Sequence, residues 1–300
     1  MIDRRAFWSR VFTYISTPTT DDGETVDETR LCQVIDYQIE HGVHGICVLG
    51  STGGNGSFND EEMRSATEIA AKHAAGRISV IAGTGARTTS ACIALSKHAQ
   101  EVGCDAVMIL PVSYWPLTPD EVFAHYERVA GAIDIPICAY NNPWTTGVDM
   151  KPEFLARLTA LDNVSCIKES TGDLTRITAI RRLTTDRVTI VAGWESSSLQ
   201  AFMAGVTGWA PVCTNFVPDI AVKFFDAAVR QRKAVEAGLL WDALFPICEV
   251  ICAKSHICVA HTGLDILGRP VGPPRRPVAD VGRGRSYKTH GDPRRGGSRE

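Results

Sequence analysis

Val164-Ser165-Cys166-Ile167-Lys168-Glu169 is the stretch that decides the fold, because it is a short apolar run that ends in two charged residues. Seven further runs of similar length recur along the chain. They are rich in Val and Ile and bounded by Gly, Pro or Asn, as buried parallel strands are. The predicted strands are Val11–Ser16, Gly45–Gly50, Ser79–Gly83, Ala106–Pro111, Pro136–Asn141, Val164–Glu169, Val188–Gly193 and Trp209–Cys213.

Amphipathic segments of helical length separate these strands. Thr118 is followed three residues later by Glu121, which matches a helix-capping box. The predicted helices are Asp27–His41, Asn59–Ala75, Thr88–Val102, Thr118–Ile133, Lys151–Leu161, Leu174–Thr184, Ser197–Ala204 and Val217–Ala237.

Eight strand–helix units favour an α/β fold closed into a (β/α)8, or TIM, barrel over an open doubly wound sheet. The open sheet would need a phosphate-binding first turn. Gly83-Thr84-Gly85 is a weak match to one, and the glycine-rich stretch Gly50–Ser57 lacks the lysine of a P-loop. The sequence therefore predicts no nucleotide site.

The alternation of strand and helix segments changes twice along the sequence and divides the chain into three parts. Residues 1–238 carry the barrel pattern, and residues 239–279 are predicted as a helical extension, with one or two helices over Leu239–Val259. Residues 280–300 are rich in Gly and Arg and cannot bury enough apolar surface to fold, so we expect a disordered tail. The formal net charge of −3 does not favour nucleic acid as a partner.

Composition also bounds the location of the protein. Ten cysteines are scattered, mostly in apolar runs, which is typical of buried free thiols in a reducing compartment. Cys248 and Cys252 are four residues apart but lack a second pair to complete a zinc site. We recognise no secretory signal and no apolar run of about 18 residues, so we expect a cytoplasmic protein without a membrane span.

In a barrel of this kind, chemistry lies at the carboxyl ends of the strands. Side chains alternate along a strand, so Val164, Cys166 and Lys168 are expected to share the face that points into the barrel. An ammonium is costly to bury, and burial favours the neutral amine that can attack a carbonyl carbon. The alternative is a lysine that is paired with Glu169 or Asp173.

Two further strand ends carry polar groups. Tyr140 is in phase with Cys138 and is expected to face inward, where a phenol can transfer protons; the alternative is a core tyrosine with a satisfied hydroxyl. Gly50-Ser51-Thr52-Gly53-Gly54 follows the second strand and offers backbone N–H groups and two hydroxyls, which suit a carboxylate. The alternative for this segment is an ordinary tight turn.

These residues resemble the dihydrodipicolinate synthase / N-acetylneuraminate lyase family of class I pyruvate aldolases. The resemblance covers roughly residues 10–265. The matching motifs are Gly50-Ser51-Thr52-Gly53, Ala82-Gly83-Thr84-Gly85, Tyr140-Asn141-Asn142-Pro143 and Ile167-Lys168-Glu169-Ser170-Thr171-Gly172-Asp173.

The resemblance implies that Lys168 forms a Schiff base with a 2-keto acid and that Tyr140 transfers protons, helped by Ser51. It implies that Ser51 and Thr52 hold the keto-acid carboxylate. It also implies no metal or organic cofactor, since the protonated imine is the electron sink, and a homotetramer built as a dimer of dimers. The other substrate-binding residues that it implies are Gly53, Thr145, Thr171, Gly193, Glu195 and Ala210.

Three positions depart from the family pattern. Gly54 stands where a glutamate usually follows the GSTG motif, and Thr145 stands where the dihydrodipicolinate synthases carry an arginine for the second substrate. Ser113, followed by Tyr114, replaces a relay tyrosine. We therefore predict an aldolase or dehydratase that acts on a 2-keto acid. The alternatives are dihydrodipicolinate synthase and a non-catalytic keto-acid binder.

Four tryptophans fall at or near the predicted mouth of the barrel: Trp115, Trp144, Trp194 and Trp209. They suggest large apolar walls and a substrate with a flat or apolar part beyond the keto acid. The alternative for Trp115 and Trp144 is packing at a subunit interface.

Overall fold

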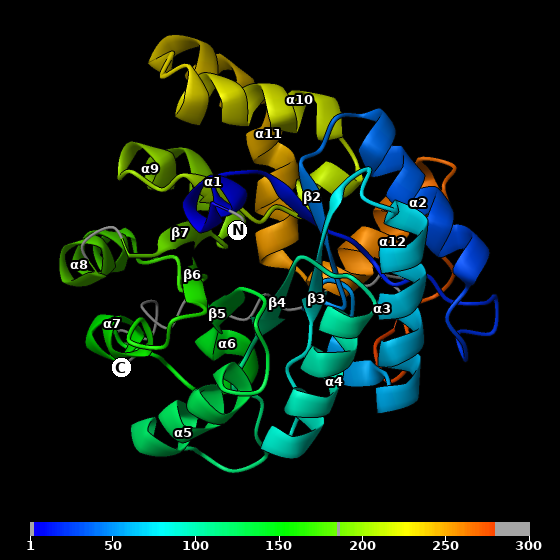
Figure 1. Ribbon diagram of the computed structural model, residues 1–300. Helices are drawn as coiled ribbons and strands as arrows, with labels where there is room; N and C mark the ends of the chain where they lie inside the picture. The colour runs from blue at the N-terminus through cyan, green and yellow to red at the C-terminus, as the bar shows by residue number, and fades with distance from the viewer. Residues whose placement is uncertain (1–2, 185–186, 280–300) are drawn as a thin grey trace, which may run out of the picture.

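The computed structural model describes residues 3–184 and 187–279. One parallel sheet of eight strands runs in the order β1 to β8, and the bridge between Val11 and Trp209 brings its two ends together. Helices surround the strands (Figure 1). The predicted (β/α)8 barrel is therefore confirmed. The strands are β1 Phe12–Tyr14, β2 Gly45–Val48, β3 Ser79–Gly83, β4 Ala106–Ile109, β5 Ile137–Asn141, β6 Val164–Glu169, β7 Thr189–Ala192 and β8 Gly208–Trp209.

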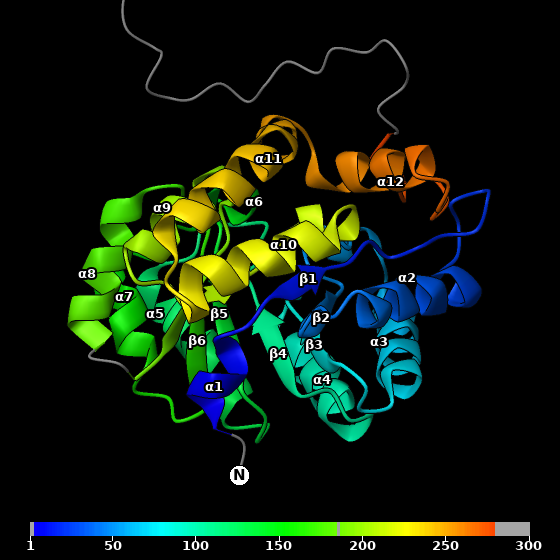
Figure 2. The same ribbon diagram turned by 90° about the horizontal axis from the view of Figure 1, so that it is seen from above.

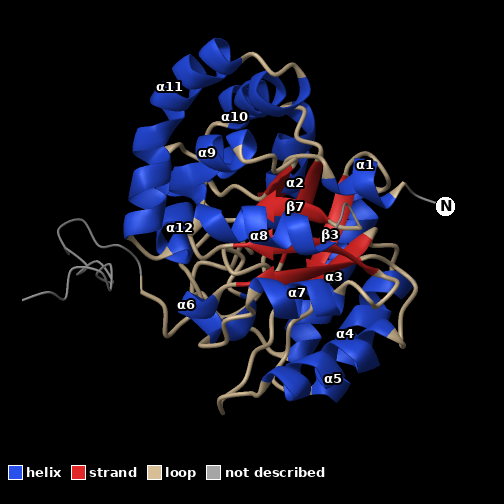
Figure 3. Ribbon diagram, turned by 90° about the vertical axis from the view of Figure 1, so that its left-hand side faces the viewer, coloured by secondary structure: helices blue, strands red, loops and turns tan. Residues whose placement is uncertain are grey.

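Four of the outer helices, α2, α3, α4 and α5, begin at a side-chain cap that the sequence supplies. Asn59 and Glu62 form a capping box at the start of α3, and Thr118 and Glu121 form the predicted box at the start of α5. These helices form the outer layer around the strands (Figure 3). The barrel helices are α2 Glu28–Glu40, α3 Asp60–Ala74, α4 Thr89–Glu101, α5 Pro119–Ala130, α7 Pro152–Leu158, α8 Leu174–Thr184, α9 Ser198–Met203 and α10 Pro218–Phe225.

Two ends of the barrel differ in what covers them. The short helix α1 (Arg4–Trp8) lies at the amino end of the strands, whereas α6 (Pro143–Thr146), α11 (Ala234–Ala253) and α12 (His256–Ile266) lie at the carboxyl end (Figure 2). Phe7 and Trp8 of α1 are buried with the residues that fill the barrel interior. The Trp8 indole N–H donates to Ser165 Oγ at 2.9 Å, so α1 plugs the amino end.

A β-bulge changes the predicted alternation of β6. The pairing with β5 moves from Ile137–Val164 to Cys138–Cys166, which leaves Ser165 as an extra residue. Val164 consequently packs in the outer apolar layer, while Cys166 lies in the barrel interior. The expectation that Val164 shares the inward face with Cys166 and Lys168 was wrong for Val164 alone.

The last barrel unit ends earlier than the sequence suggested. β8 is not Trp209–Cys213: Val212 and Cys213 donate their N–H groups to Glu195, and Cys213 begins the turn η3 (Cys213–Asn215). Val217–Ala237 is not one helix either. A π-helical turn, η4 (Asp226–Arg230), follows α10, and Arg232 then adopts a left-handed φ of 55°.

The helical extension is confirmed as two helices, and it begins with α11 at Ala234 rather than at residue 239. The tail predicted for residues 280–300 lies outside the described residues. In the part of the chain that the structure describes, every helix is too short or too polar to cross a membrane.

Candidate active site

Lys168 ends β6 inside the carboxyl mouth of the barrel and is 4% exposed. Its Nζ lies 3.4 Å from the ring centroid of Tyr14 and 4.1 Å from that of Tyr140. No carboxylate of the described residues forms an ion pair with Nζ: Glu169 pairs instead with Arg176 on the opposite face of the strand. The alternative of a structural lysine–Glu169 pair is therefore wrong.

Tyr140 lies directly across the sheet from the lysine, because Tyr140 of β5 and Lys168 of β6 are paired in register. The tyrosine is 2% exposed. Its hydroxyl oxygen accepts a hydrogen bond of 2.9 Å from the Asn142 side-chain amide. Since that oxygen is already an acceptor, its own proton is free to be donated toward the mouth.

Gly193 keeps space open beside the amine. A Cβ at this position would lie 2.8 Å from Lys168 Cε and 2.0 Å from Ser170 Oγ. Ser170 is 2% exposed, and its hydroxyl has no hydrogen-bond partner among the described residues. The predicted substrate-contacting glycine is thus in direct contact with the lysine stem, next to an unsatisfied buried hydroxyl.

The turn after β2 is shaped by a left-handed residue. Leu49 has a φ of 56°, which is unusual for a branched side chain. Gly83 permits this turn, because a Cβ there would lie 2.0 Å from the Leu49 carbonyl oxygen. The N–H groups of Ser51 and Thr52 donate to no acceptor within residues 3–184 and 187–279. They are available to an anion, as the sequence predicted.

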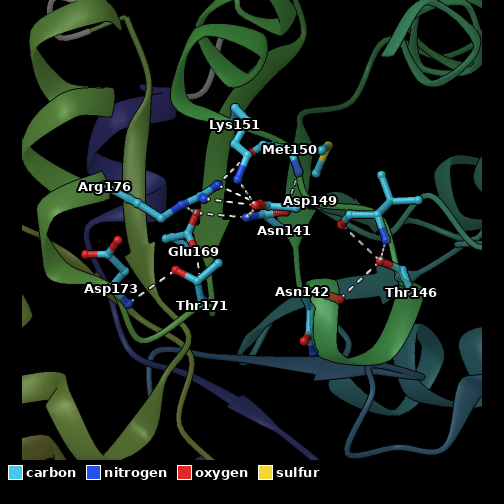
Figure 4. A network of polar contacts seen from close by, with 11 residues as sticks. Asn141, Asn142, Thr146, Asp149, Met150, Lys151, Glu169, Thr171, Asp173 and Arg176 are labelled. Atoms are coloured by element: carbon cyan, nitrogen blue, oxygen red, sulfur yellow. Dashed lines mark hydrogen bonds and ion pairs between the residues drawn. The ribbon is translucent and has the colours of Figure 1, made fainter. Parts of the chain in front are cut away.

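A polar network fixes the outer faces of β5 and β6 behind the two site residues (Figure 4). Asn141 donates to Glu169 at 3.0 Å and accepts the Met150 N–H at 2.9 Å. Arg176 of α8 lies 3.5 Å from Glu169 and donates to the Met150 carbonyl at 2.6 Å. Because Asn141 and Glu169 follow Tyr140 and Lys168 directly, this network holds the two strand ends in register.

Asp149 connects the same network to solvent. Burial alone would raise the pKa of Asp149, but hydrogen bonds from Lys151 and Arg176 outweigh burial and hold that pKa below its usual value. The Arg176 guanidinium approaches Asp149 at 2.8 Å. Asp149 and Glu169 thus share one cation, which keeps the negative charge of Glu169 directed away from Lys168.

Glu195 lies buried at the end of β7, where desolvation raises the pKa of its carboxyl group above the usual value. Its carboxylate accepts the N–H groups of Val212, at 3.0 and 3.1 Å, and Cys213, at 2.6 Å. The structure therefore places Glu195 as an anchor for the turn after β8. A carboxylate oxygen of Glu195 and the Cys213 and Cys248 sulfurs lie within 4.8 Å of one another, as the ligands of a metal ion could. The carboxylate, however, already accepts hydrogen bonds from the N–H groups of Val212 and Cys213.

The remaining predicted substrate residues lie at different depths. Ala210 is 5% exposed and faces the barrel interior, and the half-buried Thr171 donates its N–H to Glu169 at 2.8 Å. Thr145 is exposed on α6, where its N–H donates to the Asn142 carbonyl. Gly53 needs its small size, since a Cβ there would meet the Leu49 backbone at 3.0 Å.

His256, the first residue of α12, was missed by the sequence analysis. Burial and the positive charge of Lys168 lower the pKa of His256 to about 4. The adjacent Ile257 side chain lies 3.7 Å from where a Gly54 Cβ would be. Gly54, which replaces the usual glutamate, thus faces the extension helix, and no local pattern in the sequence could reveal this long-range contact.

The tryptophans do not all line the mouth. Trp209 is fully buried and donates its indole N–H to Ser198 at 2.8 Å, so its assignment to the mouth was wrong. Trp144 and Trp194 follow β5 and β7 on either side of β6, with ring centroids 6.5 Å apart. Trp115 is 72% exposed and contacts Tyr114 edge to face.

A buried amine beside the ring of a tyrosine that is paired with it in register, at the carboxyl end of a (β/α)8 barrel, defines a class I aldolase-type lyase that forms a Schiff base with its substrate. The profile of the Dihydrodipicolinate synthetase family matches residues 7–290. The chain belongs to this family.

Relatives agree along nearly the whole chain. It is 32% identical over 272 residues to the 4-hydroxy-tetrahydrodipicolinate synthase of Methanothrix thermoacetophila, covering 90% of this chain and 91% of the relative. The dihydrodipicolinate synthase of Aquifex aeolicus superposes with a TM-score of 0.87 at 28% identity, covering 91% of this chain and 92% of that one. The chloride-inhibited dihydrodipicolinate synthase of Acinetobacter baumannii, complexed with pyruvate, gives 0.87 at 26% identity, covering 91% and 94%.

Replacement of Arg176 tests the network behind the strands. In Arg176→Gln, Glu169 loses the cation with which it pairs in the described part of the chain while it is 3% exposed, so we expect the free energy of unfolding to fall by about 3–5 kcal/mol. Urea titration followed by circular dichroism measures this loss. Lys72→Gln removes an exposed ion pair and serves as the control, with an expected change under about 1 kcal/mol. Equal effects of the two substitutions would contradict the assigned role.

The low pKa of His256 predicts a pH-dependent stability. Between pH 6.5 and about 4 the unfolded chain binds a proton at His256 that the folded chain does not, so stability falls as the pH is lowered through this range. His256→Gln should make the decrease in urea midpoint between pH 7 and pH 5 smaller. Part of the decrease should remain, because the pKa of His44 is also about 4. An unchanged pH dependence in the variant would show that folding does not lower the pKa of His256.

Proposed function

We propose that the protein cleaves or dehydrates a 2-keto acid through an imine on Lys168, as an aldolase or dehydratase. The observation that carries this proposal is the Lys168 amine, 4% exposed and without a carboxylate partner among the described residues, in register with Tyr140. A lysine in this setting is available as a nucleophile rather than as half of an ion pair.

The residues suit each step of this chemistry. The free N–H groups of Ser51 and Thr52 would bind the carboxylate and direct the C2 carbonyl toward Nζ. The amine adds to C2, the hydroxyl of Tyr140 protonates the departing oxygen, and water leaves to give the iminium ion. In a cleavage, the iminium then accepts the electron pair of the C3–C4 bond while the C4 hydroxyl gives its proton to the Tyr140 phenolate. In a dehydration, the iminium accepts the pair of a broken C3–H bond instead, and the resulting enamine expels the protonated C4 hydroxyl as water. The reaction as proposed uses no metal or organic cofactor.

Dihydrodipicolinate synthase activity, the condensation of pyruvate with aspartate semialdehyde, is the second candidate. The names of the relatives favour it, as does the pyruvate complex of the Acinetobacter enzyme. Thr145 and Ser113 stand where that activity would use an arginine and a tyrosine, and neither can bind a carboxylate as a guanidinium does. We therefore place it second, and a non-catalytic keto-acid binder third.

Trp144 and Trp194 support a substrate with a flat or apolar part beyond the keto acid. Both follow strands next to β6, and Gly172 approaches the Trp194 ring so closely that a Cβ would lie 3.3 Å from it. The exposed ring of Trp144 is available to a ligand, or to a neighbouring subunit in the alternative assignment.

We infer a homotetramer, built as a dimer of dimers, in which the exposed Tyr114 and Trp115 are covered by another subunit; light scattering would measure its mass. The ten cysteines are free thiols, which fits a reducing, cytoplasmic location. The proposed partner is a small-molecule 2-keto acid, with no role for nucleic acid or a membrane.

Covalent trapping tests the imine. Wild-type protein treated with pyruvate and borohydride should gain the mass of one reduced adduct on the peptide that contains Lys168. Lys168→Arg should gain none, whereas Lys151→Arg, which changes an exposed lysine, should trap like wild type. Tyr140→Phe should trap far more slowly, by about 100-fold or more, since proton transfer is lost. Absence of any adduct in the wild type with several keto acids would favour the non-catalytic binder.

A substrate panel tests the reaction and the apolar wall. We expect pyruvate release from 4-hydroxy-4-phenyl-2-oxobutanoate to exceed both release from a polyhydroxylated 2-keto acid and condensation of pyruvate with aspartate semialdehyde. Trp144→Ala should raise KM for the phenyl substrate by about tenfold, equivalent to about 1.4 kcal/mol. Trp115→Ala should leave it unchanged. Preference for the polyhydroxylated acid would remove the apolar-substrate proposal, and faster condensation would establish the second candidate.

A further inference from the structure

Tyr14 of β1 is the aromatic side chain nearest to the Lys168 nitrogen, and it has no role in the proposed imine chemistry. Its ring centroid lies 3.4 Å from Nζ, closer than the ring of Tyr140 at 4.1 Å. Both distances are well within the 6 Å over which a ring face attracts a cation. The nitrogen is thus enclosed between two π faces, one from β1 and one from β5.

The Tyr14 ring is fixed from several sides. It is 2% exposed, and its hydroxyl donates to the Met108 sulfur at 3.2 Å, away from the mouth. Gly50 leaves room for it, because a Cβ there would lie 2.8 Å from a ring carbon. Burial raises the pKa of Tyr14 well above its usual value, so the phenol stays neutral. Tyr14 therefore contacts the nitrogen through its ring, not through its hydroxyl.

The groups that face Lys168 include no better partner for a positive charge. They are Tyr14 from β1, Cys47 from β2, Tyr140 from β5, Cys166 from β6, Glu195 from η2 (Glu195–Ser197) and His256 from α12. Burial raises the pKa of the Cys47 thiol to about 12, so it carries no charge. The Glu195 carboxylate is committed to the N–H groups of Val212 and Cys213.

We propose that the Tyr14 ring is the cation partner of the Lys168 nitrogen and favours its charged forms, the ammonium and the iminium, over the neutral amine and enamine. The part of this proposal that concerns the iminium rests on the proposed function, whereas the part that concerns the ammonium does not. Imine formation from the neutral amine is balanced as amine plus ketone plus one proton giving iminium plus water, so the ring favours the iminium over the neutral amine. Starting from the ammonium the charge does not change, and the ring then favours neither side. The ring face supplies this preference without a carboxylate that could itself take the proton.

The preference of the ring for a positive charge can be tested without a substrate. Trace acetic anhydride acetylates only the neutral amine, so the yield on the Lys168 peptide, measured by mass spectrometry against pH, gives a midpoint for Lys168. Lys72, 70% exposed, provides the internal reference in every sample. Tyr14→Phe keeps the ring and should leave the Lys168 midpoint nearly unchanged. Tyr14→Leu removes the ring and should lower the midpoint by about one pH unit, a tenfold shift.

A graded series guards against misfolding of Tyr14→Leu. Phenylalanine, 3,5-difluorophenylalanine and pentafluorophenylalanine at position 14 keep the ring size and progressively weaken its negative face. We expect the midpoint to fall along this series, while the midpoint of Lys72 stays constant. The same midpoint throughout the series, or a rise, would overturn the proposal. Wild-type protein that acetylates as expected but traps no keto acid would refute the proposed function and leave the role of Tyr14 standing.

Discussion

Parallel pairing of β5 with β6 places Tyr140 directly opposite Lys168, and the chemistry of the site depends on this register. A slip by one residue would turn one of the two side chains to the helix layer. Asn141, Glu169 and Arg176 oppose such a slip from the outer face. Tyr140 and Lys168 point into the barrel, and the residues that follow them, Asn141 and Glu169, point to the helix layer. The alternation of side chains along one pair of strands therefore positions both the reactive groups and the polar network that holds them.

The sequence was sufficient to predict the barrel, its eight strands and most helices, because each strand is a short apolar run and helices such as α3 and α5 begin at a recognisable cap. Lys168 and Tyr140 could be predicted because each ends an apolar strand in the inward phase. The bulge at Ser165 could not, since it depends on how β6 meets β5 and on the Trp8 side chain from a helix that was not predicted.

Glu195, His256 and Tyr14 show what local sequence patterns omit. Glu195 has the residue type and position of a substrate ligand, yet its partners are backbone N–H groups supplied by the turn after β8. His256 comes from a helix nearly 90 residues after the lysine, and no periodicity marks it. Tyr14 was inside a predicted strand and in phase with the mouth. Alternation alone could have identified it, but only the coordinates reveal that its ring faces the amine.

The aromatic plug formed by Phe7, Trp8 and Phe12 affects how substrates enter and products leave the barrel. With the amino end filled by these rings, a small molecule approaches Lys168 from the carboxyl ends of the strands. A keto acid bound covalently to the lysine is then the first molecule to enter and the last to depart. Whatever fragment is cleaved from it leaves first, so the architecture itself imposes an order on product release.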